Sequence, residues 1–315
     1  MKEIRGDLAN ARDVAKACEG VDCVIHCGAL VDISIFPDKC ALEAVNVEGT
    51  RNVINACIEQ NVPYLVFTST AYTVIGANHI FYGTETTTFK PRSFLMGSYA
   101  ETKFRAEQLV LQANSRALRD GEGTLRTCVL RPTVIFGEEE KHFISRMTSV
   151  GKLYWTGTVP KIQFIDERFQ LTYAGNAAYA HILAKDRLRE STECAGETFF
   201  ITDDTPLDEL YASIKPFVEA QEMKLSELSL PYVAVVFVLL LLSTLARIIR
   251  PIYQVGELFP TPSKITAVCM SVFFNRQKAA LRLKYYPCYT PEESQERTIK
   301  YYERVKSKRH ETSDT

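Results

Sequence analysis

The chain has 315 residues, of which 46% are apolar and 24% charged, and this composition excludes a largely disordered protein. The formal net charge is −1, and no Arg/Lys-rich helix is interleaved with aromatic residues, so no nucleic-acid partner is expected. The nine cysteines include no C-x-x-C pair and no Cys/His cluster with zinc spacing, which indicates reduced thiols in a cytosol-facing protein and predicts no metal site.

Short apolar runs alternate with helical patterns along most of the chain. Strands are predicted over 21–27, 64–68, 127–130 and 198–202, where apolar and β-branched residues run together. Helices are predicted over 40–59, 98–114, 174–187 and 207–220, where apolar residues recur at helical spacing. This alternation predicts an α/β fold of the Rossmann type, a doubly wound parallel sheet with helices on both faces, followed by a helical C-terminal region.

The most apolar segment is 230–246, LPYVAVVFVLLLLSTLA, which carries no charge and precedes Arg247 and Arg250. A membrane-spanning helix needs about 20 apolar residues, so this segment is at the lower limit. A helix that is apolar on every side must be buried in something. The segment therefore predicts membrane association, by spanning or by lying in the interface, and the alternative is a fully buried core helix.

A tyrosine and a lysine stand four residues apart at Tyr99 and Lys103, within the predicted helix 98–114. At that spacing the two side chains share one helix face. A neighbouring ammonium, together with a positive nicotinamide ring, would lower the phenol's pKa, and the tyrosine could then take a proton from an alcohol as hydride leaves its carbon.

The same spacing recurs at Tyr211…Lys215 and Tyr302…Lys306. Only Tyr99 follows a buried strand that ends in hydroxyl residues, at 68–70, and open α/β sheets bind ligands at such carboxyl ends. We therefore interpret the other two pairs as ordinary surface pairs.

Several motifs in order give the chain a resemblance to a known family. They are RGDL (5–8), VIHCGALVD (24–32), NVEGTRNVI (46–54), LVFTST (65–70), YAETK (99–103), LRPTVIFG (130–137), YAGNAAYAHILA (173–184), ITDDTP (201–206) and RPIY (250–253). With these motifs the chain resembles the 3β-hydroxysteroid dehydrogenase/Δ5–Δ4 isomerase family of extended short-chain dehydrogenases/reductases, from Arg5 to about Lys308. The resemblance implies an incomplete NAD-binding catalytic domain over 1–205 and a substrate-binding, membrane-associated region over 206–315.

By position, the resemblance assigns Tyr99 as the catalytic acid/base, Lys103 as its partner on the nicotinamide ribose, and Thr70 as the hydroxyl that positions the substrate, with Ser69 as the alternative. Asn46 either supports the site from behind or only packs its helix. The residues implied in cofactor binding are Asp7, Leu8, Cys27, Gly28, Ala29, Tyr99, Lys103 and Pro132.

Three other polar positions have a structural interpretation. His26 lies within a predicted strand and His181 within a predicted helix, so both are expected to be satisfied core histidines. Asp203 and Asp204 precede Thr-Pro and are expected to form a turn or a helix cap.

The family opens with a strand, a G-x-x-G-x-x-G turn, a helix and a second strand, and none of these has a counterpart here. Because that turn binds the cofactor's pyrophosphate, we expect a sheet that is incomplete at its N-terminal side. Either this start of the chain comes from a fragmentary gene model, or the chain is a short isoform that has lost catalysis.

The resemblance implies oxidation of a steroid or sterol 3β-hydroxyl with NAD, with NADP as the alternative cofactor and Δ5–Δ4 isomerisation as a further step. It also implies a homodimer at the endoplasmic reticulum membrane, with the mitochondrial membrane as the alternative, and a catalytic part that faces the cytosol. Two other functions are open: an inactive membrane-bound lipid-binding or regulatory pseudoenzyme, and a sugar-nucleotide epimerase, which the apolar segment disfavours.

Overall fold

The computed structural model describes residues 3–154, 157–163, 168–250 and 259–313. Its main sheet has four strands, all parallel, in the order β1-β2-β4-β8. The strands are β1 (Cys23–His26), β2 (Tyr64–Thr68), β4 (Arg126–Pro132) and β8 (Glu197–Ile201). Each lies within a few residues of a strand predicted from its apolar run, so the parallel α/β sheet is confirmed.

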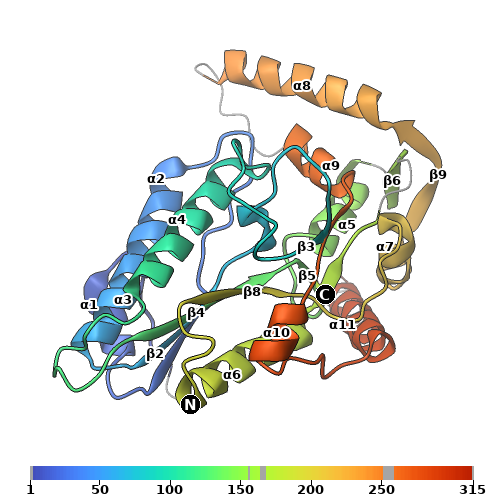
Figure 1. Cartoon of the computed structure of the whole chain (residues 1–315). Coiled ribbons are helices and arrows are strands. Elements are labelled where there is room, and N and C mark those ends of the chain that lie inside the picture. Colours follow the sequence, from blue (N-terminus) through green and yellow to red (C-terminus); the bar gives the residue numbers. More distant parts are fainter. Residues whose placement is uncertain (1–2, 155–156, 164–167, 251–258, 314–315) are drawn as a thin grey trace.

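Helices cover both faces of this sheet (Figure 1). On one face, Leu65, Phe67 and Val129 pack against α1 (Ala11–Ala17), α3 (Gly49–Glu59) and α4 (Gly97–Ala113). On the other, Val66, Cys128 and Leu130 pack against α6 (Ala174–Glu190) and α10 (Gln277–Arg282). Successive strand residues point to opposite faces, so continuous apolar runs are what a doubly covered sheet requires.

The predicted helix over 40–59 is one continuous coil with a change of winding. It begins as α2 (Lys39–Leu42), passes through a π-helical turn over Glu43–Glu48 and continues as α3. Single π-helical turns inside helices occur often at functional sites. This turn carries Asn46, which is buried.

Three two-stranded parallel pairs and four more helices surround the end of the sheet. The pairs are β3 (Ile80–Gly83) with β10 (Val272–Phe274), β5 (Val134–Phe136) with β7 (Leu171–Tyr173), and β6 (Thr158–Gln163) with β9 (Lys224–Pro231). The helices are α5 (Ile144–Tyr154), α7 (Leu210–Glu219), α9 (Pro262–Val268) and α11 (Pro291–Ser313). The β3–β10 pair joins the segments on either side of residue 205, so the two predicted regions are interleaved in space.

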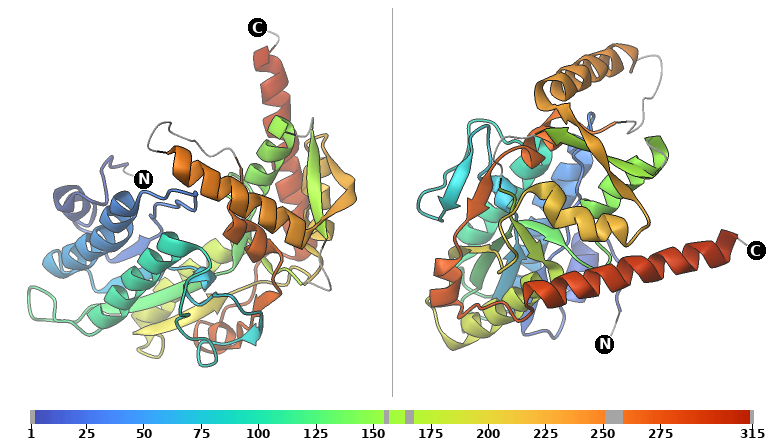
Figure 2. Two further views of the ribbon diagram at one scale, coloured as in Figure 1. Left: turned by 90° about the horizontal axis from the view of Figure 1, so that it is seen from above. Right: turned by 90° about the vertical axis from the view of Figure 1, so that its right-hand side faces the viewer.

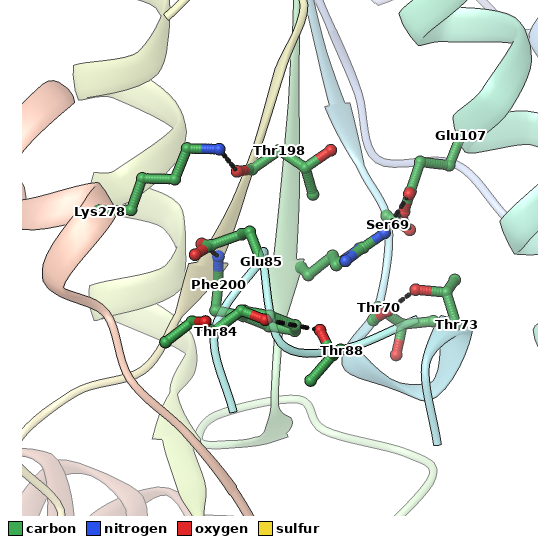
Figure 3. A network of polar contacts seen from close by, with 11 residues as sticks. Ser69, Thr70, Thr73, Thr84, Glu85, Thr88, Glu107, Thr198, Phe200 and Lys278 are labelled. Carbon is green, nitrogen blue, oxygen red and sulfur yellow. Dashed lines mark hydrogen bonds and ion pairs between the residues drawn. The ribbon is translucent and has the colours of Figure 1, made fainter. Parts of the chain in front are cut away.

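Side chains close the outer edge of β8. The Glu85 carboxylate accepts a hydrogen bond from the Phe200 N–H at 2.7 Å, and the Lys278 ammonium donates to the Thr198 carbonyl at 2.9 Å (Figure 3). Charged groups on an edge strand prevent pairing with another chain. Within the described residues no strand lies beside the other edge, at β1, where Ile25 is exposed.

The predicted apolar segment forms α8 (Tyr232–Ile249), which lies along the outside of the molecule (Figures 1 and 2). Its mean hydropathy is 2.4, and it is long and apolar enough to cross a membrane. Only Leu239, Ser243 and Ala246 are buried against the body. A fully buried core helix is therefore wrong, because most of this apolar surface is exposed in the part of the chain that the structure describes.

Candidate active site

The residues that follow the carboxyl ends of β1, β2 and β4 lie at one edge of the sheet. Cys27 follows β1, Thr68 ends β2 and Pro132 ends β4, and β2 is paired with both of the other strands. The Thr68 hydroxyl donates to the Cys27 sulfur at 3.1 Å. The topology therefore brings together predicted residues that are far apart in sequence, at the edge where open α/β sheets bind ligands.

Lys103 reaches this edge from α4. Its ammonium donates to the Thr68 carbonyl oxygen at 2.8 Å and lies 4.3 Å from the centre of the Phe67 ring. The side chain is buried, and burial lowers its pKa to about 8.

Tyr99 lies one helical turn earlier, in an apolar cluster with Tyr72, Met96 and Ala267. Burial raises the pKa of Tyr99 to about 12. The lowering of the pKa was expected from Lys103 together with a positive nicotinamide ring. In the protein alone, desolvation of the phenol dominates, and the Lys103 ammonium is directed at the Thr68 carbonyl. At neutral pH the phenol is protonated and is a hydrogen-bond donor.

The two candidate hydroxyl groups after β2 have different partners, and Figure 3 shows that of Ser69, Glu107. Ser69 is buried and donates to the Glu107 carboxylate at 2.6 Å, and Glu107 is also ion-paired with buried Arg131. The Thr70 oxygen accepts a hydrogen bond from the Tyr72 N–H at 3.3 Å, and its own O–H has no acceptor among the described residues. Of the two, Thr70 is the one with a proton to donate to a ligand.

Of the cofactor-binding residues predicted near the N-terminus, Leu8 lies against the turn formed by Cys27, Gly28 and Ala29, and Asp7 forms no hydrogen bond with that turn among the described residues. A Cβ on Gly28 would stand 2.7 Å from Leu8 Cδ1, so Leu8 packs directly on the turn after β1. Cys27, Gly28 and Ala29 are exposed on that turn. The Asp7 carboxylate caps its own turn by accepting from the Ala9 N–H at 2.9 Å.

Asn46 connects this turn to α4. Its amide donates to the Leu30 carbonyl at 3.0 Å and to the Thr102 hydroxyl at 3.1 Å, and its oxygen accepts from the Leu30 N–H at 2.8 Å. Thr102 in turn donates to the Tyr99 carbonyl at 2.9 Å. Of the two interpretations of Asn46, these contacts favour support of the site over simple helix packing.

The histidines and Asp203 are structural, as the sequence predicted. His26 is buried, hydrogen bonds to Thr50 at 3.0 Å, and has its pKa lowered to about 3 by burial and by Lys103. His181 is buried between the Ala177 carbonyl at 2.7 Å and the Thr68 hydroxyl at 2.6 Å. Asp203 accepts from the Tyr173 N–H at 2.7 Å, at the start of α6.

A cavity of about 190 Å³ borders the apolar cluster that contains Tyr99. Tyr72 and Met96 of that cluster line one part of the cavity, and residues from α5, β6, α7, α9 and the loops near them line much of the rest. Tyr72 is two residues from Thr70 and Met96 is three residues from Tyr99, so their closeness in sequence to the predicted site residues could have identified them as cavity residues. Nothing in the sequence pattern indicated Lys264 of α9, which also lines the cavity.

Two tyrosines interpreted as surface residues are buried instead, so that prediction was wrong. The Tyr211 hydroxyl accepts from the Ile162 N–H at 2.8 Å, and Tyr211 also lines the cavity. Tyr302 packs in the same core cluster as Phe217. Their lysine partners do lie outside that core, where Lys215 pairs with Glu219 and Lys306 with Glu222. Of the RPIY motif, residues 251–253 lie outside the described residues.

Comparison with known proteins relates this architecture to one family. The profile described as "3-beta hydroxysteroid dehydrogenase/isomerase family" matches residues 1–232. The chain is 31% identical over 289 residues to short-chain dehydrogenase/reductase family 42E member 1 of Danio rerio, covering 90% of this chain and 73% of that protein. It is 30% identical over 295 residues to the Mus musculus protein of that name, covering 91% and 73%.

Solved structures share the fold at low sequence identity. The epimerase Mth375 of Methanothermobacter thermautotrophicus superposes with a TM-score of 0.69 at 14% identity, over 95% of this chain and 77% of that one. MoeE5, in complex with UDP-glucose and NAD, gives a TM-score of 0.66 at 17% identity, over 96% and 86%.

Proposed function

Because the chain belongs to the 3-beta hydroxysteroid dehydrogenase/isomerase family, we propose that it oxidises the 3β-hydroxyl group of a steroid or sterol with NAD. One observation carries this proposal. Lys103 and Thr70 lie at the carboxyl end of β2, Tyr99 precedes Lys103 by one turn of α4, and an apolar cavity is lined by Tyr72 and Met96, which share the cluster of Tyr99. An alcohol on a bulky apolar molecule is the substrate that such a combination fits.

The residues at the sheet edge fit a nicotinamide cofactor. Lys103 holds an ammonium at the end of β2, and the turn of Cys27, Gly28 and Ala29 is exposed with a glycine against Leu8. In the proposal Lys103 would bind the ribose, the turn and Pro132 would flank the nicotinamide cofactor, and the bound cofactor would supply the hydride acceptor. NADP is the alternative cofactor.

The protein's own groups divide the work of proton transfer. Thr70 donates a hydrogen bond to the substrate oxygen and orients it. Tyr99 takes the hydroxyl proton during oxidation and returns one to the carbonyl oxygen in the reverse direction. Its raised pKa favours the protonated phenol, so the protein alone is prepared for reduction and needs added positive charge for oxidation. Asn46 fixes α4 relative to the turn after β1 through its hydrogen bonds to Thr102 and Leu30.

Membrane association is part of the proposal. The outward face of α8 exposes Val233, Phe237, Leu241 and Leu245, among others. A groove between α8 and α9, lined by Leu240, Ser243 and Thr261 among other residues, lies next to the segment that carries Lys264 into the cavity. A sterol dissolved in the endoplasmic reticulum membrane would reach the cavity from this side, and the catalytic part would face the cytosol.

The test is NADH formation by the purified full chain in neutral detergent, with a 3β-hydroxy-5-ene steroid as substrate. Tyr99→Phe is expected to lower kcat/KM at least about 100-fold, because proton transfer in the transition state is lost. Tyr302→Phe is the matched control, since Tyr302 has the same lysine spacing but lies outside the site, and it should retain activity.

NAD binding, measured by calorimetry, separates the dehydrogenase from the inactive lipid-binding protein. NAD binding without turnover would mean that the substrate is another one, such as another alcohol or the sugar nucleotide of an epimerase. Absence of both NAD binding and turnover would sink the dehydrogenase proposal in favour of the inactive lipid-binding protein.

A further inference from the structure

The groove between α8 and the body of the protein has polar walls, although α8 itself is almost entirely apolar. It has a volume of about 290 Å³, and it is formed by α8, by the start of α9, over which α8 lies, and by the loop before α2 (Figure 1). Five of the nine described residues that line it carry a hydroxyl group: Ser34, Ser243, Thr244, Thr261 and Ser263. Such walls suit a ligand with several hydrogen-bonding oxygens better than a purely apolar ligand.

Ser243 contributes a buried hydroxyl group to the groove. The residue is 5% exposed, and its Oγ has no hydrogen-bond partner among the described residues. A serine or threonine in a helix can donate to the carbonyl one turn earlier, as Thr244 does to the Leu240 carbonyl at 2.8 Å, but Ser243 makes no such bond. A buried hydroxyl without a partner lowers stability, so an oxygen of a ligand in the groove would satisfy it.

Positive charge flanks the groove at the C-terminal end of α8. Arg247 lines it from the last turn, and Arg250 follows one turn later with its guanidinium 4.4 Å from the centre of the Phe36 ring. No aspartate or glutamate is among the described lining residues. The nearby Asp32 carboxylate accepts from two backbone N–H groups, and the charge of Lys264 offsets it. A guanidinium beside hydroxyl groups is a typical environment for a bound phosphate group.

The position of the groove favours a lipid headgroup as the source of that phosphate. The outward face of α8, with Phe237 and Leu241, is the side that the proposed function assigns to the hydrocarbon. A helix that lies in the membrane interface buries its apolar face by about 5–10 Å, and a helix is itself about 10 Å wide. The opposite side of α8, which carries Ser243, would therefore lie at the depth of the phosphate groups.

We propose that this groove binds the phosphate of an anionic phospholipid, with Arg247 as a bidentate donor and Ser243 as a further hydrogen-bond donor. The inference rests on the membrane association in the proposed function, and it adds the class of lipid that is recognised. Because residues of both α8 and α9 line the groove, a bound headgroup would also fix the membrane helix on the catalytic part.

The experiment measures flotation of the purified full chain with three kinds of vesicle. These are phosphatidylcholine alone, phosphatidylcholine with phosphatidic acid, and phosphatidylcholine with oleate at the same negative surface charge. The affinity for the vesicles with phosphatidic acid should be at least about tenfold higher than for the other two, because only they combine an accessible phosphate with a net negative charge. Equal affinity for phosphatidic acid and oleate would indicate attraction to surface charge alone and would overturn the inference.

Variants assign the preference to the groove. Arg247→Lys keeps the charge but loses the bidentate geometry, so it should remove most of the preference for phosphatidic acid. Ser243→Ala should weaken the preference without lowering the Tm in neutral detergent, because the hydroxyl has no partner until lipid binds. Arg116→Lys makes the same chemical change at an exposed position after α4, outside the groove lining, and should have no effect.

Inorganic phosphate, titrated by calorimetry into the chain in neutral detergent, tests the other source of this chemistry. Binding is expected to be weak, and tight binding that Arg247→Lys abolishes would overturn the lipid assignment in favour of a soluble phosphate compound. A preference for phosphatidic acid that survives in both Arg247→Lys and Ser243→Ala would also overturn the inference.

The outcomes separate this inference from the proposed function. Flotation requires no turnover, so absence of NADH formation would count only against the dehydrogenase proposal. Binding to vesicles with phosphatidic acid, but not to phosphatidylcholine alone, supports the inference and counts against a contribution from hydrocarbon contact alone. Failure to bind any vesicle would overturn both the inference and the membrane association on which it rests.

Discussion

The Lys103 ammonium donates a hydrogen bond to the Thr68 carbonyl oxygen at 2.8 Å, which fixes a cation at the carboxyl end of β2. The bond joins residues 35 positions apart and connects α4 to the centre of the sheet. The contact with the Phe67 ring adds a cation–π attraction. These two contacts hold the ammonium in a buried position, where desolvation disfavours its charged form and lowers its pKa.

Lys103→Met is expected to stabilise the fold. Lowering the pKa from 10.5 to about 8 means that folding opposes the charged form, by at most about 3 kcal/mol. Below pH 8, Lys103 is protonated in both the folded and the unfolded protein, and the free energy of unfolding is lowered by the full amount. Between pH 8 and 10.5 only the unfolded protein keeps this proton, so the loss of stability becomes smaller as the pH rises, and above pH 10.5 it is absent.

Thermal unfolding of wild type and Lys103→Met at pH 7 and pH 10 measures this difference. The variant should have the higher Tm at pH 7, with a smaller advantage at pH 10, and should lose any dehydrogenase activity. A lower Tm at pH 7 would mean that the Thr68 and Phe67 contacts outweigh desolvation.

Thr70→Val and Ser69→Ala should have opposite consequences. Thr70→Val removes a hydroxyl with a free O–H, so we expect a loss of kcat of about 100-fold with a small change in stability. Ser69→Ala removes a donor to Glu107 and should lower the free energy of unfolding by about 1–3 kcal/mol while the folded fraction remains active. Steady-state kinetics with urea unfolding of both variants checks this, and exchanged phenotypes would assign the substrate hydroxyl to Ser69.

The pH dependence should follow the phenol of Tyr99. Its pKa of about 12 in the protein alone means that the fraction of phenolate rises throughout the accessible alkaline range. The rate of alcohol oxidation should therefore increase from pH 7 to pH 10, and carbonyl reduction should not. The profile of kcat/KM, which follows the pKa values of the free enzyme, tests this expectation in both directions, and a flat profile for oxidation would contradict the raised pKa of Tyr99.

Glu107→Gln should be strongly destabilising. Glu107 is fully buried, pairs with Arg131 and accepts from Ser69, so the change leaves a buried guanidinium without its counter-charge. Breaking such a pair costs roughly 3–5 kcal/mol. Glu43→Gln removes the partner of Arg105 at 2.6 Å on the surface, where the loss should be at most about 1 kcal/mol. Similar losses in both variants would contradict this assignment.

Polar substitution of α8 should release the protein from lipid. Phe237 and Leu241 are more than half exposed on the outward face, so Phe237→Glu with Leu241→Glu places two charges against the hydrocarbon. The variant should fail to float with neutral phosphatidylcholine vesicles and should remain folded by circular dichroism. Val21→Glu, at an exposed position just before β1, is the control that should still float. Flotation of the α8 variant would place the membrane contact elsewhere.

The local pattern of residues was sufficient for the elements of the fold. The apolar runs at 64–68 and 127–130 became β2 and β4, and helical spacing around Tyr99 and Lys103 became α4. The π-helical turn at Asn46 was not predicted, and neither were the hydrogen bonds that Asn46 makes with Leu30 and Thr102. The spacing of apolar residues predicts a helix, but it does not predict a side-chain hydrogen bond between distant parts of the chain.

What the sequence by itself determined is the α/β class, the order of the strands along the chain, the apolar segment and the candidates Tyr99 and Lys103, since each depends on neighbours within one or two helical turns. Only the tertiary structure decided that Ser69 belongs to the buried Glu107 pair, that Tyr211 is a cavity residue and that Lys264 faces the same cavity. These assignments depend on groups from distant parts of the chain, whose desolvation and hydrogen bonding are set when the helices pack on the sheet.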